Sequence, residues 1–171
     1  MSRKSSTNLT LGLALALAAF AAGDAAAQEA IKIGVTQPLT GAVAASGNYV
    51  TNGARIAEEA INRQGGVLGR KIQLIIEDNK SNPKEAVATA EKLIVRDKVP
   101  VMMGAWSSTY TLAIMPKLIE YGVPMLVETS SSGKITTSGN PWIFRISPTS
   151  AMEALAFGKQ LASFSPAIKK V

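Results

Sequence analysis

The chain of 171 residues contains neither cysteine nor histidine. Their absence excludes disulfide frameworks, Cys/His zinc sites, Ser-His-Asp triads and thiol nucleophiles. Aromatic residues make up only 5% of the sequence, and no basic stretch is longer than two residues, although Lys and Arg outnumber Asp and Glu by 18 to 12. A protein that binds nucleic acid concentrates its basic residues on one element with aromatics between them. We therefore expect no nucleic acid partner and interpret the net charge of +6 as solvated surface.

Long apolar runs are also rare, and the one near the N-terminus has the features of a secretory signal peptide. Arg3 and Lys4 precede an uncharged Ala/Leu-rich stretch, residues 9–22, and the small residues Ala25–Ala27 follow it. A transmembrane anchor needs about 20 apolar residues, which is more than this stretch offers. The order of a basic start, an apolar segment and an A-x-A site predicts cleavage after Ala27 and an exported, soluble mature protein.

The mature part, residues 28–171, is long enough for one domain of ordinary size. Strand and helix patterns alternate along it. The expected strands are the short apolar runs 30–35, 72–76, 99–103, 123–127 and 142–146, and residues 169–171 resemble the start of another. The expected helices cover residues 50–61, a segment that follows Asn82 and carries apolar residues to Ile94, residues 108–121 and residues 150–164. Regular alternation of this kind predicts an α/β fold in which helices cover both faces of a parallel sheet.

Two of the expected helices have recognisable start signals. Asn82 is expected to cap the second helix, with Pro83 in its first turn and Glu85 reaching back from the third position. Ser150 is expected to cap the last helix in the same way.

Familiar catalytic and cofactor motifs are not satisfied. The glycines after the first strand are not spaced as G-x-G-x-x-G, so a dinucleotide site is not expected. Gly133-Lys134 resembles the end of a phosphate loop, but Ile135 stands where the Ser/Thr ligand of magnesium should be. No G-x-S-x-G elbow exists, and Glu77-Asp78 is interpreted as a solvated strand end in preference to an acid–base pair. We expect no enzyme activity, no cofactor and no metal site.

Two hydroxyl clusters follow expected strands and are candidates for a binding site. Ligands of parallel sheets bind beyond the carboxyl ends of the strands, which here selects residues 37–48, 78–82, 104–109 and 128–134. The clusters are Ser107-Ser108-Thr109 and Thr129-Ser130-Ser131-Ser132. Hydroxyl groups and free N–H groups at a helix N-terminus suit a carboxylate. At this point two interpretations stay open: the clusters together bind a carboxylate, or one serine only caps a helix and the second cluster is a flexible loop.

Several longer stretches of the mature chain form one motif pattern that can be compared with known families. They are Ile31–Val35 continued by Pro38–Gly41, Asn62–Lys71, Glu77-Asp78 with Asn82-Pro83, the turn from Gly104 to Ser107-Ser108, and Asn140–Arg145. This pattern resembles the periplasmic leucine/isoleucine/valine-binding protein family, the solute receptors of branched-chain amino-acid ABC importers. The resemblance runs across the whole mature chain, and the stretch Asn62–Lys71 is its most specific part.

The resemblance implies the type I periplasmic-binding fold, a two-lobed venus flytrap that closes on its ligand by hinge motion. It also implies that Ser108, beside Ser107, and Ser131 bind the carboxylate of the ligand, and that Thr129 offers a backbone carbonyl to the ligand amine. Ser46 falls at a pocket position where some members have Tyr, and Trp106 at a wall position that is aliphatic in the leucine-type receptor. These two departures suit an aromatic or otherwise non-standard carboxylate, whereas ordinary packing under the loop is the alternative for Trp106.

The length of the chain is the larger departure, because family members run to more than twice 171 residues. We expect residues 1–27 to be the signal peptide and residues 28–171 to be most of the first lobe, truncated before the second. The second lobe would supply the acidic group for the ligand amine.

The expected function is an exported, periplasmic solute receptor without catalysis of its own. It would capture a branched-chain or related hydrophobic amino acid, or a small carboxylate or amide, and deliver it to the membrane permease of an ABC importer. The first alternative is an extracellular sensing module of the same fold that feeds a receptor or a channel. The second is an exported hydrolase.

Overall fold

The computed structural model describes residues 29–164, which form a five-stranded parallel sheet with helices on both faces. The strand order is β2-β1-β3-β4-β5. The strands are β1 (Ile31–Gln37), β2 (Ile72–Asp78), β3 (Met102–Gly104), β4 (Met125–Val127) and β5 (Ile143–Arg145). The helices are α2 (Ala44–Arg63), α3 (Pro83–Glu91) with its π-helical continuation η1 (Lys92–Arg96), α4 (Ser108–Tyr121), α5 (Lys134–Thr137) and α6 (Ser150–Ala162). The fold class predicted from the alternating pattern is confirmed.

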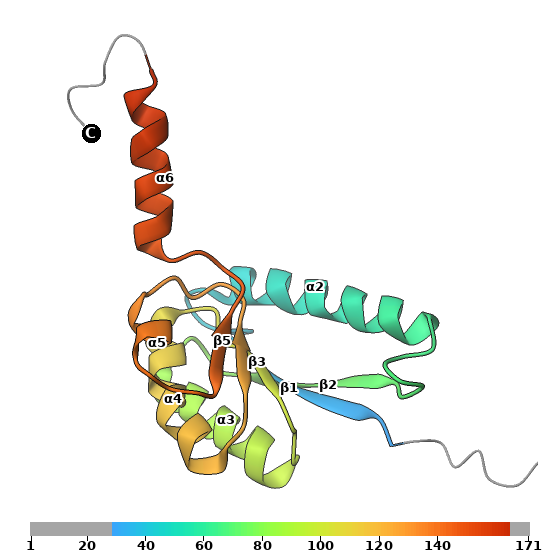
Figure 1. Ribbon diagram of the computed structural model, residues 1–171. Helices are drawn as coiled ribbons and strands as arrows, with labels where there is room; N and C mark the ends of the chain where they lie inside the picture. The colour runs from blue at the N-terminus through green and yellow to red at the C-terminus, as the bar shows by residue number, and fades with distance from the viewer. Residues whose placement is uncertain (1–28, 165–171) are drawn as a thin grey trace, which may run out of the picture.

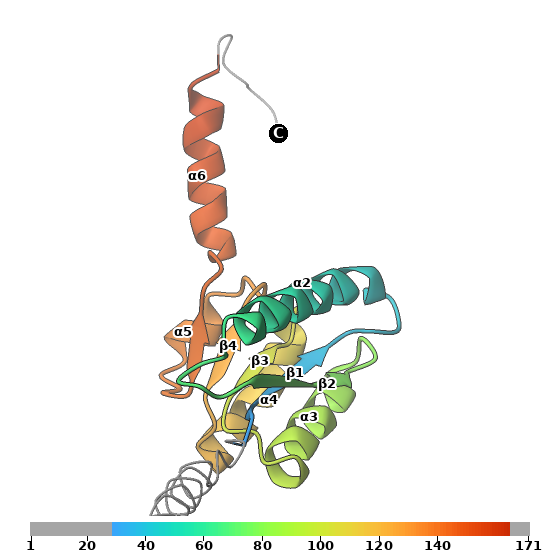
Figure 2. The ribbon, with the colours of Figure 1, turned by 90° about the vertical axis from the view of Figure 1, so that its right-hand side faces the viewer.

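The main core lies between the sheet and the helices α3 and α4. Figures 1 and 2 show α2 on one face of the sheet and α3 with α4 on the other. Met102 of β3, Met125 of β4 and Leu118 of α4 have no exposed surface. Burial of apolar side chains at about 25 cal/mol per Å² is the main source of stability for such a layer.

The opposite face of the sheet is covered only in part. Side chains alternate between the two faces along a strand, and in β4 the buried Met125 and Val127 flank Leu126, which is 37% exposed. Phe144 of β5 pairs in register with Leu126 and is 55% exposed. The helix α2 packs over β1 and β2, so this face remains open over β4 and β5.

The strand boundaries differ from the expected ones by at most three residues. β1 runs to Gln37 because its whole length pairs with β2. β3 starts only at Met102, since Pro100 has no N–H to donate and Val99 instead donates its N–H to Leu93 O at 3.1 Å. The side chain of Val99 packs where a side chain on Gly34 would lie.

The starts of two helices correct the sequence interpretation. Asn82 caps α3 as expected, its Oδ1 accepting from the N–H groups of Lys84 and Glu85. The reach-back contact of Glu85 was wrong, because its carboxylate forms an ion pair with Lys80 at 3.2 Å. Ser150 as the cap of α6 was also wrong: Thr149 Oγ1 accepts from Met152 N at 3.1 Å.

The helix α2 begins at Ala44, six residues before the apolar pattern starts at Val50. The extra turns are fixed by packing and side-chain bonds. A Cβ on the buried Gly47 would lie 2.1 Å from Pro38 O, so only glycine permits this approach. Asn48 Nδ2 donates to Leu39 O at 3.1 Å and to Ala44 O at 2.8 Å.

The helix α6 stands away from the rest of the described chain (Figure 1). Its apolar side chains Met152, Leu155 and Phe157 are at least 60% exposed. No helix among residues 29–164 is long and apolar enough to cross a membrane. The signal peptide and the strand expected at 169–171 lie outside the described residues.

Candidate functional site

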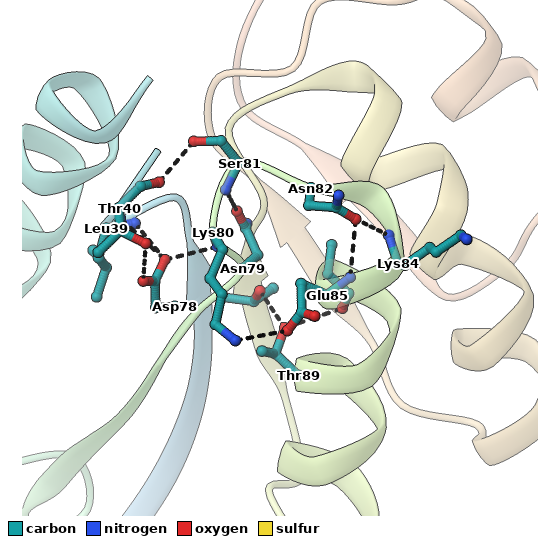
Figure 3. A network of polar contacts seen from close by, with 12 residues as sticks. Leu39, Thr40, Asp78, Asn79, Lys80, Ser81, Asn82, Lys84, Glu85 and Thr89 are labelled. Atoms are coloured by element: carbon teal, nitrogen blue, oxygen red, sulfur yellow. Dashed lines mark hydrogen bonds and ion pairs between the residues drawn. The ribbon is translucent and has the colours of Figure 1, made fainter. Parts of the chain in front are cut away.

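The loops at the carboxyl ends of β1 and β2 are held together by the carboxylate of Asp78 (Figure 3). Asp78 Oδ1 accepts from the N–H groups of Leu39 at 2.8 Å, Thr40 at 3.2 Å and Lys80 at 2.8 Å, and Oδ2 accepts from Thr40 Oγ1 at 2.6 Å. Ser81 Oγ donates to Thr40 O at 2.8 Å. These bonds fix the segment that leads into α2. The expectation of a merely solvated strand end therefore missed a structural role of Asp78.

The pKa of Asp78 lies below its ordinary value. Burial of the group raises the pKa, but the hydrogen bonds from Thr40, Lys80 and Leu39 to the ionised form outweigh burial. Asp78 is therefore a charged structural anchor of the carboxyl edge.

The two hydroxyl clusters meet at the N-terminus of α4. Ser107 caps the helix, its Oγ accepting from Thr109 N at 3.3 Å, so the capping interpretation is correct for this residue. Ser108 Oγ accepts from Ser132 N at 3.1 Å, which joins the loop after β3 to the loop after β4. In this bond the oxygen of Ser108 is the acceptor, so its own hydrogen stays available to a ligand.

Ser131 offers a second hydroxyl of the same kind. Its Oγ accepts from Ser150 Oγ at 2.8 Å, and its backbone carbonyl accepts from Ser150 N at 2.9 Å. The hydroxyl hydrogen of Ser131 therefore remains free to donate. Thr129, two residues earlier, is exposed.

Ser130 is buried and does not belong with the exposed hydroxyls of its cluster. Its Oγ donates to Trp106 O at 3.0 Å and lies 2.8 Å from Thr111 Oγ1. These bonds support the loop in which half-buried Trp106 adopts a φ of 67°, a conformation that is uncommon for a residue with a side chain. The sequence analysis missed the supporting role of Thr111, a polar residue on the buried face of α4.

Arg145 at the end of β5 is hydrogen-bonded to the loop after β4. Its guanidinium donates to Ser132 O at 2.8 Å, Ser130 O at 3.3 Å and Thr136 Oγ1 at 2.6 Å. The planar fork of arginine suits such convergent acceptors. In the sequence, Arg145 stands out only as the last residue of the stretch Asn140–Arg145, and nothing there predicts this role.

Ser46 lies in the first turn of α2 and is half-buried. Among residues 29–164, no hydrogen bond joins Ser46 to the serine loops. The structure thus brings together Ser107, Ser108, Ser131 and the Trp106 loop, and leaves Ser46 on a separate element of the carboxyl edge.

A polar pair, buried Gln37 and half-buried Glu128, joins the carboxyl ends of β1 and β4. Gln37 Nε2 donates to Glu128 Oε1 at 2.7 Å, and Gln37 has no exposed surface. Burial raises the pKa of Glu128, and hydrogen bonds from Gln37 and from the backbone at Glu128, Trp106 and Gly104 offset this only in part. No sequence motif singled out this pair.

The arrangement presents neutral donors at the N-terminus of a helix, which is chemistry for binding a carboxylate. In the described part of the chain, no three His, Cys, Asp or Glu side chains are grouped to hold a metal ion.

The sequence pattern of the periplasmic binding protein family matches residues 30–171. The Leu/Ile/Val-binding protein BraC3 of Rhizobium johnstonii is 38% identical over 130 residues, 76% of this chain and 34% of the relative. The branched-chain amino acid transporter substrate binding protein LivJ of Streptococcus pneumoniae, solved with isoleucine, has a TM-score of 0.68 and 30% identity over 70% of this chain and 34% of that one. An ABC transporter solute binding protein of Rhodopseudomonas palustris, solved with 3,4-dihydroxybenzoic acid, has a TM-score of 0.70 and 31% identity over 78% of this chain and 36% of that one.

The fold and the matches define a binding protein of the α/β type. This chain belongs to the periplasmic binding protein family, and the resemblance to its Leu/Ile/Val-binding members is confirmed. The matched part amounts to 34% of the length of the Rhizobium relative.

Proposed function

We propose that this chain is the ligand-binding part of an exported solute receptor of an ABC importer, and that Ser108 and Ser131 bind the carboxylate of its ligand. The observation that carries the proposal is the bond from Ser132 N to Ser108 Oγ, which joins the two serine loops at the start of α4. It leaves two hydroxyl hydrogens on adjacent loops at one edge of the sheet. Donors from neutral groups can hold a carboxylate there without a cationic side chain.

The ligand is a hydrophobic amino acid or a small aromatic acid. Half-buried Trp106 directly precedes Ser107 and Ser108 in the chain, and its indole ring would offer an apolar, planar surface to such a ligand. The relatives support both classes, because one was solved with isoleucine and another with 3,4-dihydroxybenzoic acid. For an amino acid, the backbone carbonyl of Thr129 accepts a hydrogen bond from the ammonium group. Ser46 and Ser107 line the same edge.

The receptor acts in the periplasm, delivers its ligand to a membrane permease and catalyses no reaction. The relatives support this role, because the Rhizobium relative is named a Leu/Ile/Val-binding protein and the Streptococcus one a transporter substrate binding protein. Residues 1–27 direct export and are then removed. Residues 28–171 belong to the first lobe of a two-lobed protein, and α6, which stands away from the sheet, leads out of that lobe.

A thermal-shift assay on the full-length receptor tests the proposal. The ligands are L-isoleucine and 3,4-dihydroxybenzoate, and 2-methylbutylamine serves as the control because it is isoleucine without its carboxylate. A ligand at a hundred times its Kd adds about 2.7 kcal/mol to the stability. We expect at least one acid to raise the Tm and the amine to leave it unchanged. Equal shifts with isoleucine and the amine would show that no carboxylate site exists.

A further inference from the structure

Gln37 and Glu128 share one hydrogen bond, yet each keeps a buried oxygen without a partner. The existing bond uses Gln37 Nε2 and Glu128 Oε1. The unpartnered atoms are Gln37 Oε1 and Glu128 Oε2. If Glu128 is ionised, both of these atoms are acceptors and neither can satisfy the other. Buried polar atoms are almost always hydrogen-bonded, so this state leaves two exceptions in one pair.

A proton on Glu128 Oε2 would give both unpartnered atoms, Gln37 Oε1 and Glu128 Oε2, a hydrogen-bond partner. A protonated carboxyl group has one O–H donor and one acceptor oxygen, and a primary amide has one acceptor oxygen and an N–H donor on the adjacent atom. The two groups are therefore complementary. Oε2–H of Glu128 would donate to Gln37 Oε1, while Gln37 Nε2 already donates to Glu128 Oε1.

The charges around Glu128 do not compensate an ionised carboxylate. Among the ion pairs of residues 29–164, all within 4.0 Å, none includes Glu128. On β5, the guanidinium of Arg145 is engaged by two carbonyls and Thr136. On β2, Asp78 is bound to the loop that leads into α2.

Two further neighbouring segments supply no counter-charge to Glu128. β3 and its loop, residues 102–107, contain no titratable side chain, and on α5 Lys134 is exposed. A buried carboxyl group without a cation is favoured in its neutral form, in agreement with the raised pKa of Glu128.

We propose that Glu128 is a neutral carboxylic acid in a reciprocal pair with Gln37, and that this pair positions the Trp106 loop of the carboxylate site. The second half rests on the proposed function. The pair ties β1 to β4 across β3, and two residues after Glu128 the Oγ of Ser130 donates to Trp106 O at 3.0 Å. Trp106 leads directly into Ser107 and Ser108, and Glu128 leads directly into the second serine loop. A neutral Glu128 also adds no negative charge next to a site for a negative ligand.

Carbon-13 NMR of the full chain with labelled glutamate carboxyl groups tests the protonation state, and Glu128→Gln assigns the signal. We expect the Glu128 signal to keep the chemical shift of a protonated carboxylic acid at pH 7. A Glu128 signal at the position of an ionised carboxylate at pH 7 would overturn the proposal.

Two substitutions test the reciprocal pair. Glu128→Gln can form the same two bonds with Gln37 through its amide, whereas Glu128→Ala can form neither. We expect the Tm of Glu128→Gln at pH 7 to stay close to that of the wild type and the Tm of Glu128→Ala to fall. Equal losses in both variants would contradict a pair that needs a donor at this position.

Trp106 fluorescence tests the positioning role, in a Trp142→Phe background that leaves Trp106 as the sole tryptophan. We expect its emission to shift as Glu128 ionises at rising pH, and to stay constant in Glu128→Gln. Constant emission through the Glu128 titration would refute the positioning role. Failure of the proposed function looks different: the receptor would not bind L-isoleucine or 3,4-dihydroxybenzoate, while the NMR titration of Glu128 would be unaffected.

Discussion

Replacing Ser108 with alanine removes an oxygen atom that serves two contacts. The first is the 3.1 Å bond from Ser132 N, a neutral hydrogen bond that contributes about 0.5–1.5 kcal/mol to stability. The second is the proposed bond to the ligand carboxylate, which as a bond to a charged group is worth about 1.5–3 kcal/mol. Since 1.4 kcal/mol is tenfold in affinity, we expect the Kd to rise by roughly ten- to a hundredfold.

Titration calorimetry of the full-length receptor with its ligand measures this loss. Ser131→Ala should raise the Kd by a similar factor, and Ser108→Thr should restore part of the affinity because it returns a hydroxyl. Ser138→Ala is the control: Ser138 follows the last residue of α5 and its Oγ donates to Ile135 O at 3.0 Å, so the loss of this hydroxyl should leave the Kd unchanged. If Ser108→Ala, Ser131→Ala and Ser138→Ala all have small and equal effects, both clusters only cap and connect elements, and the reasoning is refuted.

Three further predictions concern export, acid stability and the isolated chain. The exported protein should begin at Gln28, and intact-mass analysis that finds Met1 on a membrane-bound form would contradict the signal peptide. Asp78 has a lowered pKa, so its contribution to stability is complete above the ordinary value of 3.8 and is lost as the pH falls through the lower folded pKa. In urea unfolding, the free energy of unfolding should therefore fall more steeply towards acid pH in the wild type than in Asp78→Asn. At neutral pH this variant should be about 1–3 kcal/mol less stable. Parallel pH profiles of the two proteins would exclude this role of Asp78. Residues 28–171 alone should self-associate in sedimentation experiments through exposed Leu126 and Phe144. They should bind the ligand with a Kd near millimolar (about −4 kcal/mol) in place of micromolar (about −8 kcal/mol). Micromolar binding by this part would mean that the site needs no second lobe.

The elements with the strongest local signals were predicted best. The helix expected at 108–121 has the observed bounds of α4, since its apolar periodicity and its cap are both local features. Asn82 and Pro83 likewise marked the start of α3 correctly. The start of α2 was missed because the turns before Val50 depend on the close contact between Gly47 and Pro38. The periodicity of apolar residues does not encode this contact.

The sequence predicted which loops carry the candidate site, but the contacts of the single serine side chains came only from the structure. That the serines follow β3 and β4 is a property of the chain order, and parallel strands bring their carboxyl ends to one edge. Which serine points where depends on contacts across that edge. Ser130 turns to Trp106 and Thr111, while Ser108 accepts from Ser132.

Local sequence was therefore sufficient for the alternation of strands and helices, for the family and for the edge of the sheet that carries the hydroxyl groups. These follow from periodicity and chain order, which short segments encode. The tertiary structure alone revealed three sets of hydrogen bonds: those of Asp78 to the loop after β1, those of Arg145 to the serine loop after β4, and the one between Gln37 and Glu128. Residues 37 and 128 are 91 positions apart. They meet only because β1 and β4 flank β3, and burial at that place, which no local pattern encodes, sets the pKa of Glu128 and leaves Gln37 as its partner.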